Sequence, residues 1–298
     1  MVLGTVWRAV VPPIAMLAVL GLLAACGSGD DEASGAGLPQ LVATTTIWAD
    51  VTSQVACGEP VESIVPAGAD PHSFEPSLRD REQLSDVGAV IANGAGLEEA
   101  LADLVDSAAG EGVPVVRIAD HVDVVDGDPH VWQDPRRVLA AVDAIETAVV
   151  GAGRDAATIG ACADAYRAEL TALDADITAI LAPVPPERRV LVTNHDAFGY
   201  FAERFGFDVV GTVIPSSSTL GEGSAGQLAA LADTIERYDV PVIFAERLGS
   251  ADEAQALAKR LGVAVVELES DALASDGTAS TYTGMMRANA ETIAAALG

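Results

Sequence analysis

From residue 41 to the end of the chain, short apolar runs alternate with longer segments in which apolar residues recur every three or four positions. The short runs, rich in β-branched residues, predict strands at residues 41–47, 61–65, 89–92, 113–118, 189–193, 208–214, 242–245 and 263–268. The longer segments predict helices at residues 48–56, 77–86, 97–109, 135–150, 156–181, 197–205, 227–238, 251–261 and 283–297. This alternation predicts an α/β fold with doubly wound parallel sheets.

The longest helical pattern, residues 156–181, divides the alternation in half. Its apolar residues, from Tyr166 through Leu170 and Leu173 to Ile177, follow one another at spacings of three or four, which predicts a stripe packed on a core. The proline-rich stretch 183–186 ends the helix. Four predicted strands precede this helix and four follow it, so we expect two similar α/β lobes.

The first 39 residues carry signals for export rather than for folding. In residues 1–25, Arg8 precedes an apolar stretch that ends in small residues, which predicts a signal peptide. The segment Leu23-Ala24-Ala25-Cys26 resembles a bacterial lipobox, in which Cys26 is lipidated and becomes the mature N-terminus. An uncleaved membrane helix over residues 7–25 is the alternative. Residues 26–39, rich in Gly, Ser, Asp and Glu, are predicted to be a flexible tether.

The charge balance is strongly acidic, with 44 Asp and Glu residues against 16 Lys and Arg and a net charge of −28. Nucleic acid is therefore excluded as a partner, because its phosphates need basic contacts. Such a surface also repels anionic headgroups, so membrane attachment requires the lipid on Cys26. Cys57 and Cys162 are the remaining cysteines. In an exported protein they either pair in a disulfide or stay as two buried thiols.

Histidine is scarce, and its placement is unusual. Two of the four histidines share one local sequence, Asp70-Pro71-His72 and Asp128-Pro129-His130, and His195 directly follows a predicted strand and Asn194. Proline restricts both itself and the residue before it, so each of these turns presents its imidazole from a stiff backbone. The fourth, His121, lies in the acidic segment 120–128, which we interpret as a solvated loop.

Three imidazoles in loops suit a divalent metal such as Zn²⁺, and a fourth ligand completes the shell. Ligands of open parallel sheets bind at the carboxyl ends of strands, where these loops lie. Three acids of the second half are candidates for the fourth position. Asp196 adjoins His195 and points away from the same centre, so a supporting or helix-starting role suits it better. Asp271 and, in reserve, Glu246 both follow predicted strands.

Four segments together carry a family resemblance: Asp-Pro-His-Ser-Phe-Glu-Pro from residue 70, Asp-Pro-His-Val-Trp from residue 128, Asn-His-Asp-Ala-Phe-Gly-Tyr-Phe from residue 194, and residues 282–289. From residue 41 to the C-terminus the chain resembles the metal-binding lipoproteins of bacterial ABC importers, the zinc- and manganese-specific solute-binding family. The resemblance implies two α/β lobes, residues 40–153 and 184–298, joined by one linker helix within residues 154–183.

The same resemblance implies a metal site made of His72, His130, His195 and Asp271. It implies a monomer outside the cytoplasm, anchored to the cell membrane by lipid, which captures Zn²⁺ as cargo and delivers it to an ABC-transporter permease without catalysis. Histidine at the third ligand position, His195, favours zinc. The segment 120–128 is short and holds one histidine, whereas many zinc binders of the family carry a long His-rich loop there. Mn²⁺ or mixed specificity therefore stays open.

Two other classes of function remain as hypotheses. A secreted zinc hydrolase would use three histidines and an open water position, yet the sequence has no His-Glu-x-x-His motif. A surface adhesin or structural lipoprotein would carry the histidines as ordinary polar residues, and its melting would not respond to chelators.

Overall fold

The computed structural model describes residues 38–247 and 251–298. The predicted signal peptide, the lipidation of Cys26 and residues 26–37 of the predicted tether lie outside the described residues. Within the described part of the chain, none of the helices combines the length and the apolar character that a membrane crossing requires.

The N-terminal lobe is built on a four-stranded parallel sheet with the order β2-β1-β3-β4. Its strands are β1 (Leu41–Ala43), β2 (Glu62–Ser63), β3 (Ala89–Ala92) and β4 (Val115–Arg117), and its helices are α1 (Thr46–Val55), α2 (Leu78–Leu84), α3 (Ala102–Gly110) and α4 (Pro135–Gly151). One buried cluster joins the sheet to α2 and α3, and a second joins it to α1 and α4. The sheet is therefore covered on both faces, as a parallel sheet requires.

The C-terminal lobe repeats this plan with the strand order β6-β5-β7-β8, again all parallel. Its strands are β5 (Val190–Thr193), β6 (Asp208–Thr212), β7 (Val242–Glu246) and β8 (Ala264–Leu268), and its helices are α6 (Gly199–Phe205), α7 (Ala225–Tyr238), α8 (Ala251–Leu261) and α9 (Tyr282–Leu297). The predicted fold class of two doubly wound lobes is confirmed.

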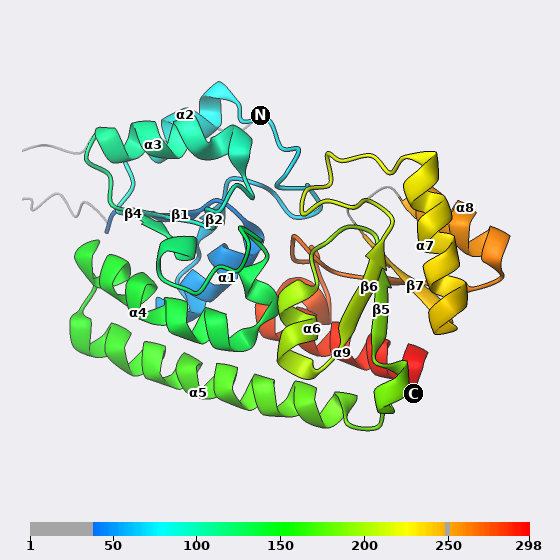
Figure 1. The fold of residues 1–298 in the computed structure, drawn as a ribbon. Coiled ribbons are helices and arrows are strands. Elements are labelled where there is room, and N and C mark those ends of the chain that lie inside the picture. Colours follow the sequence, from blue (N-terminus) through cyan, green and yellow to red (C-terminus); the bar gives the residue numbers. More distant parts are fainter. Residues whose placement is uncertain (1–37, 248–250) are drawn as a thin grey trace, which may run out of the picture. The chain divides into compact units, whose positions relative to one another are not determined.

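Helix α5 (Ala156–Leu181) connects the two lobes. It begins where the Asp155 side chain accepts a hydrogen bond from the Thr158 backbone N–H, a typical N-cap. Figure 1 shows α5 in light green along the lower side of the molecule, and it contacts α1 and α4 of the first lobe and α9 of the second. The predicted stripe is its buried face, with Leu173 and Ile177 fully buried. The long helix expected from the sequence is confirmed.

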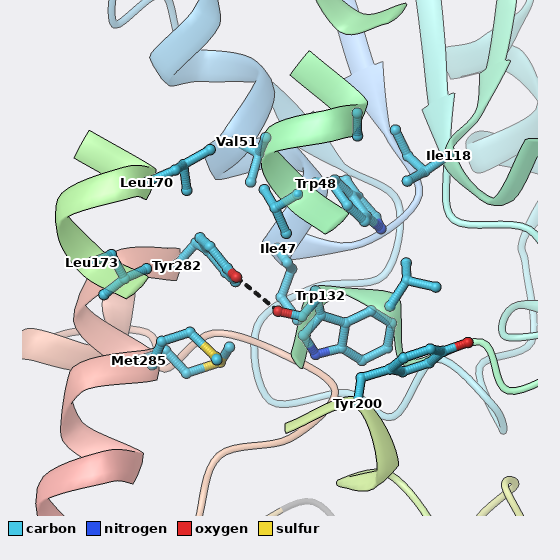
Figure 2. Packing of buried hydrophobic residues seen from close by; sticks show 14 of the residues in the cluster. Ile47, Trp48, Val51, Ile118, Trp132, Leu170, Leu173, Tyr200, Tyr282 and Met285 are labelled. Carbon is cyan, nitrogen blue, oxygen red and sulfur yellow. Dashed lines mark hydrogen bonds between the residues drawn. The ribbon is translucent and has the colours of Figure 1, made fainter. Parts of the chain in front are cut away.

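One continuous hydrophobic cluster extends through both lobes along α5. Figure 2 shows part of it, with Leu170 and Leu173 on one side and the Trp132 ring near Tyr200 on the other. The Tyr282 hydroxyl donates a 2.7 Å hydrogen bond to the Trp132 carbonyl oxygen, drawn as a dashed line in Figure 2. This shared core ties the two lobes to each other in addition to the covalent connection.

Several predicted boundaries differ from the structure by two residues or more, and two of these differences have a clear local cause. The strand expected to reach residue 47 ends at Ala43, because the Thr45 side chain accepts a hydrogen bond from the Trp48 N–H and starts α1. The helix expected at 97–109 opens with a 3₁₀ turn, Glu99–Leu101, and becomes α-helical only at Ala102. In both places a side-chain or local backbone bond overrides the periodic pattern.

Cys57 and Cys162 form a disulfide with their Cα atoms 5.4 Å apart. Cys57 follows the last turn of α1, and Cys162 lies in the second turn of α5. Nearby, the buried guanidinium of Arg154 pairs with Glu59. The sequence left a disulfide and two free thiols open, and the structure has the disulfide.

Candidate metal centre

The carboxyl ends of the strands carry the four side chains expected as ligands. His195 lies two residues after β5, and Asp271 lies three residues after β8. His72 lies in the connection between β2 and α2, and His130 lies between β4 and α4, immediately before a 3₁₀ turn at Val131–Gln133. Each lobe contributes two of the four side chains, which meet in one buried cluster.

The donor atoms of these four side chains all lie within 4.8 Å of one another. Nε2 of His130 is 3.3 Å from Nε2 of His72 and 3.2 Å from Nε2 of His195. The carboxylate oxygens of Asp271 lie 3.6 Å, 3.5 Å and 4.0 Å from Nε2 of His130, His195 and His72. Donors about 2.1 Å from a tetrahedral zinc ion would be about 3.4 Å apart, so the cluster has the size of a metal shell.

Both Asp-Pro-His segments form the same side-chain turn. Oδ1 of Asp70 accepts a 2.9 Å hydrogen bond from the His72 backbone N–H, and Oδ1 of Asp128 accepts a 3.0 Å bond from that of His130. An aspartate that caps the N–H two residues ahead holds the intervening proline turn rigid. The Asp70 turn is also linked to the other lobe, because Oδ2 of Asp70 accepts a 2.5 Å hydrogen bond from the Thr219 hydroxyl.

Carboxylates hold the outer nitrogens of two histidines, which leaves Nε2 facing the centre. Nδ1 of His130 is 2.7 Å from Oδ1 of Asp128. Nδ1 of His195 is 2.5 Å from Oε2 of Glu246, in ion-pair contact, while Oε1 of Glu246 accepts from the His195 backbone N–H at 3.0 Å. Carboxylates in this position orient a metal-binding imidazole and raise its basicity.

The buried environment shifts three pKa values. Burial lowers the pKa of His195, but Glu246 and Asp271 outweigh it and raise that pKa to about 9. Burial raises the pKa of Asp271 to about 6, against the attraction of the neighbouring histidines, which lowers it. Burial, together with the imidazoles of His130 and His195, lowers the pKa of His72 to about 4. When no metal ion is bound, His195 is therefore protonated near neutral pH.

Asp271 is poised to bind a cation with either or both oxygens. The residue is 1% exposed, and neither carboxylate oxygen has a hydrogen-bond partner among the described residues. A buried carboxylate without donors is costly, and a metal ion is the partner that this position can accommodate.

Comparison with known proteins shows the family to which the chain belongs. A family model described as "Zinc-uptake complex component A periplasmic" matches residues 41–296. The chain belongs to this family. It is therefore a metal-binding component of an ABC importer, and its relatives are named as metal-binding transport proteins. The family expected from the four sequence segments is confirmed.

The relatives of this chain are named for different metals. The chain is 34% identical to the manganese-binding lipoprotein MntA of Halalkalibacterium halodurans, over 95% of this chain and 97% of the relative. It is 32% identical to the zinc-binding protein TroA of Treponema pallidum, over 90% and 92% of the two chains. It is 27% identical to the manganese ABC transporter substrate-binding lipoprotein PsaA of Streptococcus pneumoniae, over 94% and 96%.

The solved structure of Treponema pallidum TroA, a periplasmic zinc-binding protein, matches this family member with a TM-score of 0.82 at 31% identity. The match covers 88% of this chain and 100% of the TroA chain. The two-lobed fold with a long connecting helix is thus common to both proteins.

The other residues singled out in the sequence lie outside the cluster. Glu246, the reserve ligand, is 2% exposed and supports His195 from behind. Asp196 is exposed, and α6 begins three residues later without a side-chain cap, so its expected role in starting the helix is wrong. His121 is also exposed.

Sequence reasoning missed the polar residues that hold the ligand loops. Asn93 follows β3; its side-chain N–H donates to the Pro129 carbonyl at 2.9 Å, and its Oδ1 accepts from the Trp48 indole at 2.7 Å. Trp132 and Ser270 connect the two lobes through a 2.8 Å bond from the indole N–H to the serine carbonyl. A polar residue placed directly at the end of an apolar strand, as Asn93 is, was the available signal.

Proposed function

We propose that this protein captures Zn²⁺ outside the cytoplasm and delivers it to the membrane permease of an ABC importer. The observation that carries the proposal is the convergence of three Nε2 atoms and the Asp271 carboxylate within 4.8 Å, in a cluster 0–5% exposed. Imidazole nitrogens suit zinc, and three of them with one carboxylate fill a tetrahedral shell. The metal is the cargo, and no chemical step is needed.

Mn²⁺ is the second candidate, and the free second oxygen of Asp271 favours it. A carboxylate that binds through both oxygens would give three nitrogens and two oxygens, a shell richer in the oxygen ligands that suit manganese. The names of the relatives include both metals. The donor set therefore favours a first-row divalent metal ion, with Zn²⁺ as the first candidate and Mn²⁺ as the second.

The hydrolase hypothesis is disfavoured by the same donor set. Catalytic zinc sites keep one position open for water, whereas four protein donors here complete a tetrahedral shell.

The location follows from the N-terminal signals: the lipid on Cys26 would hold a monomeric, acidic protein at the outer surface of the membrane, within reach of its permease. Relatives named as lipoproteins support this location.

Competition titration of metal-free protein against a chelating dye, with Zn²⁺ and Mn²⁺ in turn, tests the proposal. We expect His72→Ala and Asp271→Ala to weaken zinc binding by more than the roughly 10–100-fold typical of losing a contact that only supports a ligand, because each variant removes a donor from the shell. His121→Ala, an exposed histidine outside the cluster, is the matched control and should bind as the wild type does. Wild-type zinc affinity in both ligand variants would refute the site.

A further inference from the structure

Ser270 is the residue immediately before Asp271. Its hydroxyl and its backbone carbonyl oxygen each bond to a residue that supports another of the candidate ligands. Ser270 is 1% exposed. Its hydroxyl donates to Oε2 of Glu246 at 2.8 Å, and its carbonyl oxygen accepts from the indole N–H of Trp132 at 2.8 Å. Ser270 thus connects three parts of the metal centre: Asp271, which follows it, Glu246 beside His195, and Trp132 near His130.

The first contact reaches His195. Oε2 of Glu246, which accepts from the Ser270 hydroxyl, is also the atom 2.5 Å from Nδ1 of His195. The other oxygen of Glu246 accepts from the His195 backbone N–H. Rotation of the Glu246 carboxylate would break both contacts with His195. The Ser270 hydroxyl is a further donor to this carboxylate, beside the His195 N–H, and it opposes the rotation.

The second contact reaches His130 in the other lobe. Trp132 lies two residues after His130, is fully buried, and belongs to the 3₁₀ turn that starts there. Its indole N–H bonds to Ser270, and its carbonyl accepts from the Tyr282 hydroxyl, the bond drawn in Figure 2. Both ends of Trp132 are therefore fastened to the C-terminal lobe, so the position of His130 is set against the Asp271 loop.

The loop that carries Ser270 is itself fixed. The Asn289 side chain in α9 accepts from the backbone N–H of Glu269 at 3.0 Å and donates to its carbonyl at 2.7 Å. These two bonds hold the backbone of Glu269, the residue before Ser270, in one position. The Ser270 backbone is therefore fixed, so its contacts can fix the positions of the metal ligands.

We propose that Ser270 is a positioning residue that fixes His130, His195 and Asp271 relative to one another, through its hydroxyl to Glu246 and its carbonyl to Trp132. This inference rests on the proposed metal-binding function. Contacts that orient the ligands of a metal typically change its affinity about 10–100-fold when removed. Ser270 is expected to act in this range although it does not touch the ion.

Two substitutions remove the two contacts of Ser270 one at a time. Ser270→Ala removes the hydroxyl and keeps the carbonyl, and Trp132→Phe removes the indole N–H and keeps an aromatic ring. We expect each to weaken Zn²⁺ binding about 10–100-fold and to alter the visible absorption spectrum of the Co²⁺-loaded protein, which reports ligand geometry. Because both act on one loop, the double variant should lose less than the product of the two single losses.

Ser63→Ala is the matched control, since the Ser63 hydroxyl donates to the Val65 carbonyl in the N-terminal lobe, away from these contacts. Thermal unfolding of the metal-free proteins tests whether each variant folds, and Ser270→Thr, which restores a hydroxyl, should recover affinity. If Ser270→Ala does not fold, Trp132→Phe carries the test alone.

Unchanged zinc affinity and an unchanged Co²⁺ spectrum in the variants, with tight binding by the wild type, would overturn the positioning role and leave the proposed function intact. A wild type that binds neither zinc nor manganese would overturn both. A lower melting temperature without a change in affinity or spectrum would show that Ser270 serves stability alone, against the proposal.

Discussion

Metal binding should release about one proton per ion across a wide pH range, because His195 is protonated in the metal-free protein. Glu246 and Asp271 raise the pKa of His195 to about 9 in spite of its burial, so the imidazolium form dominates at neutral pH. Its Nδ1 faces Glu246, and its Nε2 faces the metal position. The proton on Nε2 must leave before that nitrogen can bind a cation.

The size and sign of the effect follow from these pKa values. Between about pH 6, where Asp271 also begins to take up a proton, and about pH 9, loss of one proton per ion weakens binding about tenfold for each unit that the pH falls. His72, with its pKa lowered to about 4, adds nothing in this window. Histidines with an ordinary pKa of about 6.5 would instead give nearly constant affinity above about pH 7.5.

Isothermal titration calorimetry of metal-free protein with Zn²⁺ at pH 8, in two buffers of different ionisation enthalpy, measures the number of protons released. Glu246→Gln provides the matched comparison, because it keeps the shape of the side chain and removes the charge that raises the pKa of His195. Proton release at pH 8 should fall towards zero in this variant. Release near zero in the wild type, or equal release in both proteins, would refute the argument.

Three further predictions concern stability. Replacement of Cys57 and Cys162 by serine should lower the free energy of unfolding by up to about 4.7 kcal/mol, because the disulfide closes a loop of 105 residues and its loss restores the entropy of the unfolded chain. The loss should appear as a lower melting temperature, and an unchanged melting temperature would contradict it. Leu173→Ala in α5 should cost about 2–5 kcal/mol in a denaturant titration, because Leu173 is fully buried, whereas Leu78→Ala, at 82% exposed, should change the free energy by less than about 0.5 kcal/mol. Zinc at a thousand times its dissociation constant should stabilise the protein by about 4.1 kcal/mol, a gain that a chelator removes in a melting experiment; chelator-insensitive melting would favour the adhesin hypothesis.

The roles of Glu246 and Thr45 show where sequence reasoning stops. Glu246 ends β7 and, on spacing alone, it is as suitable a ligand as Asp271. Only the fold places its carboxylate oxygens against Nδ1 of His195. Thr45 continues a β-branched run, yet its hydroxyl starts a helix. Both outcomes depend on competition between local bonds that a hydrophobic pattern does not record.

The sequence by itself determined the alternation of strands and helices, the long connecting helix and the loops that hold the metal-binding candidates. These features depend on periodicity and on proline turns, which act over a few residues. The tertiary structure alone decided that His72, His130, His195 and Asp271 meet within 4.8 Å and that Ser270 and Trp132 join their supports. The four ligand candidates are separated from one another by 58 to 199 positions in the chain, and only the packing of two lobes against α5 brings them together.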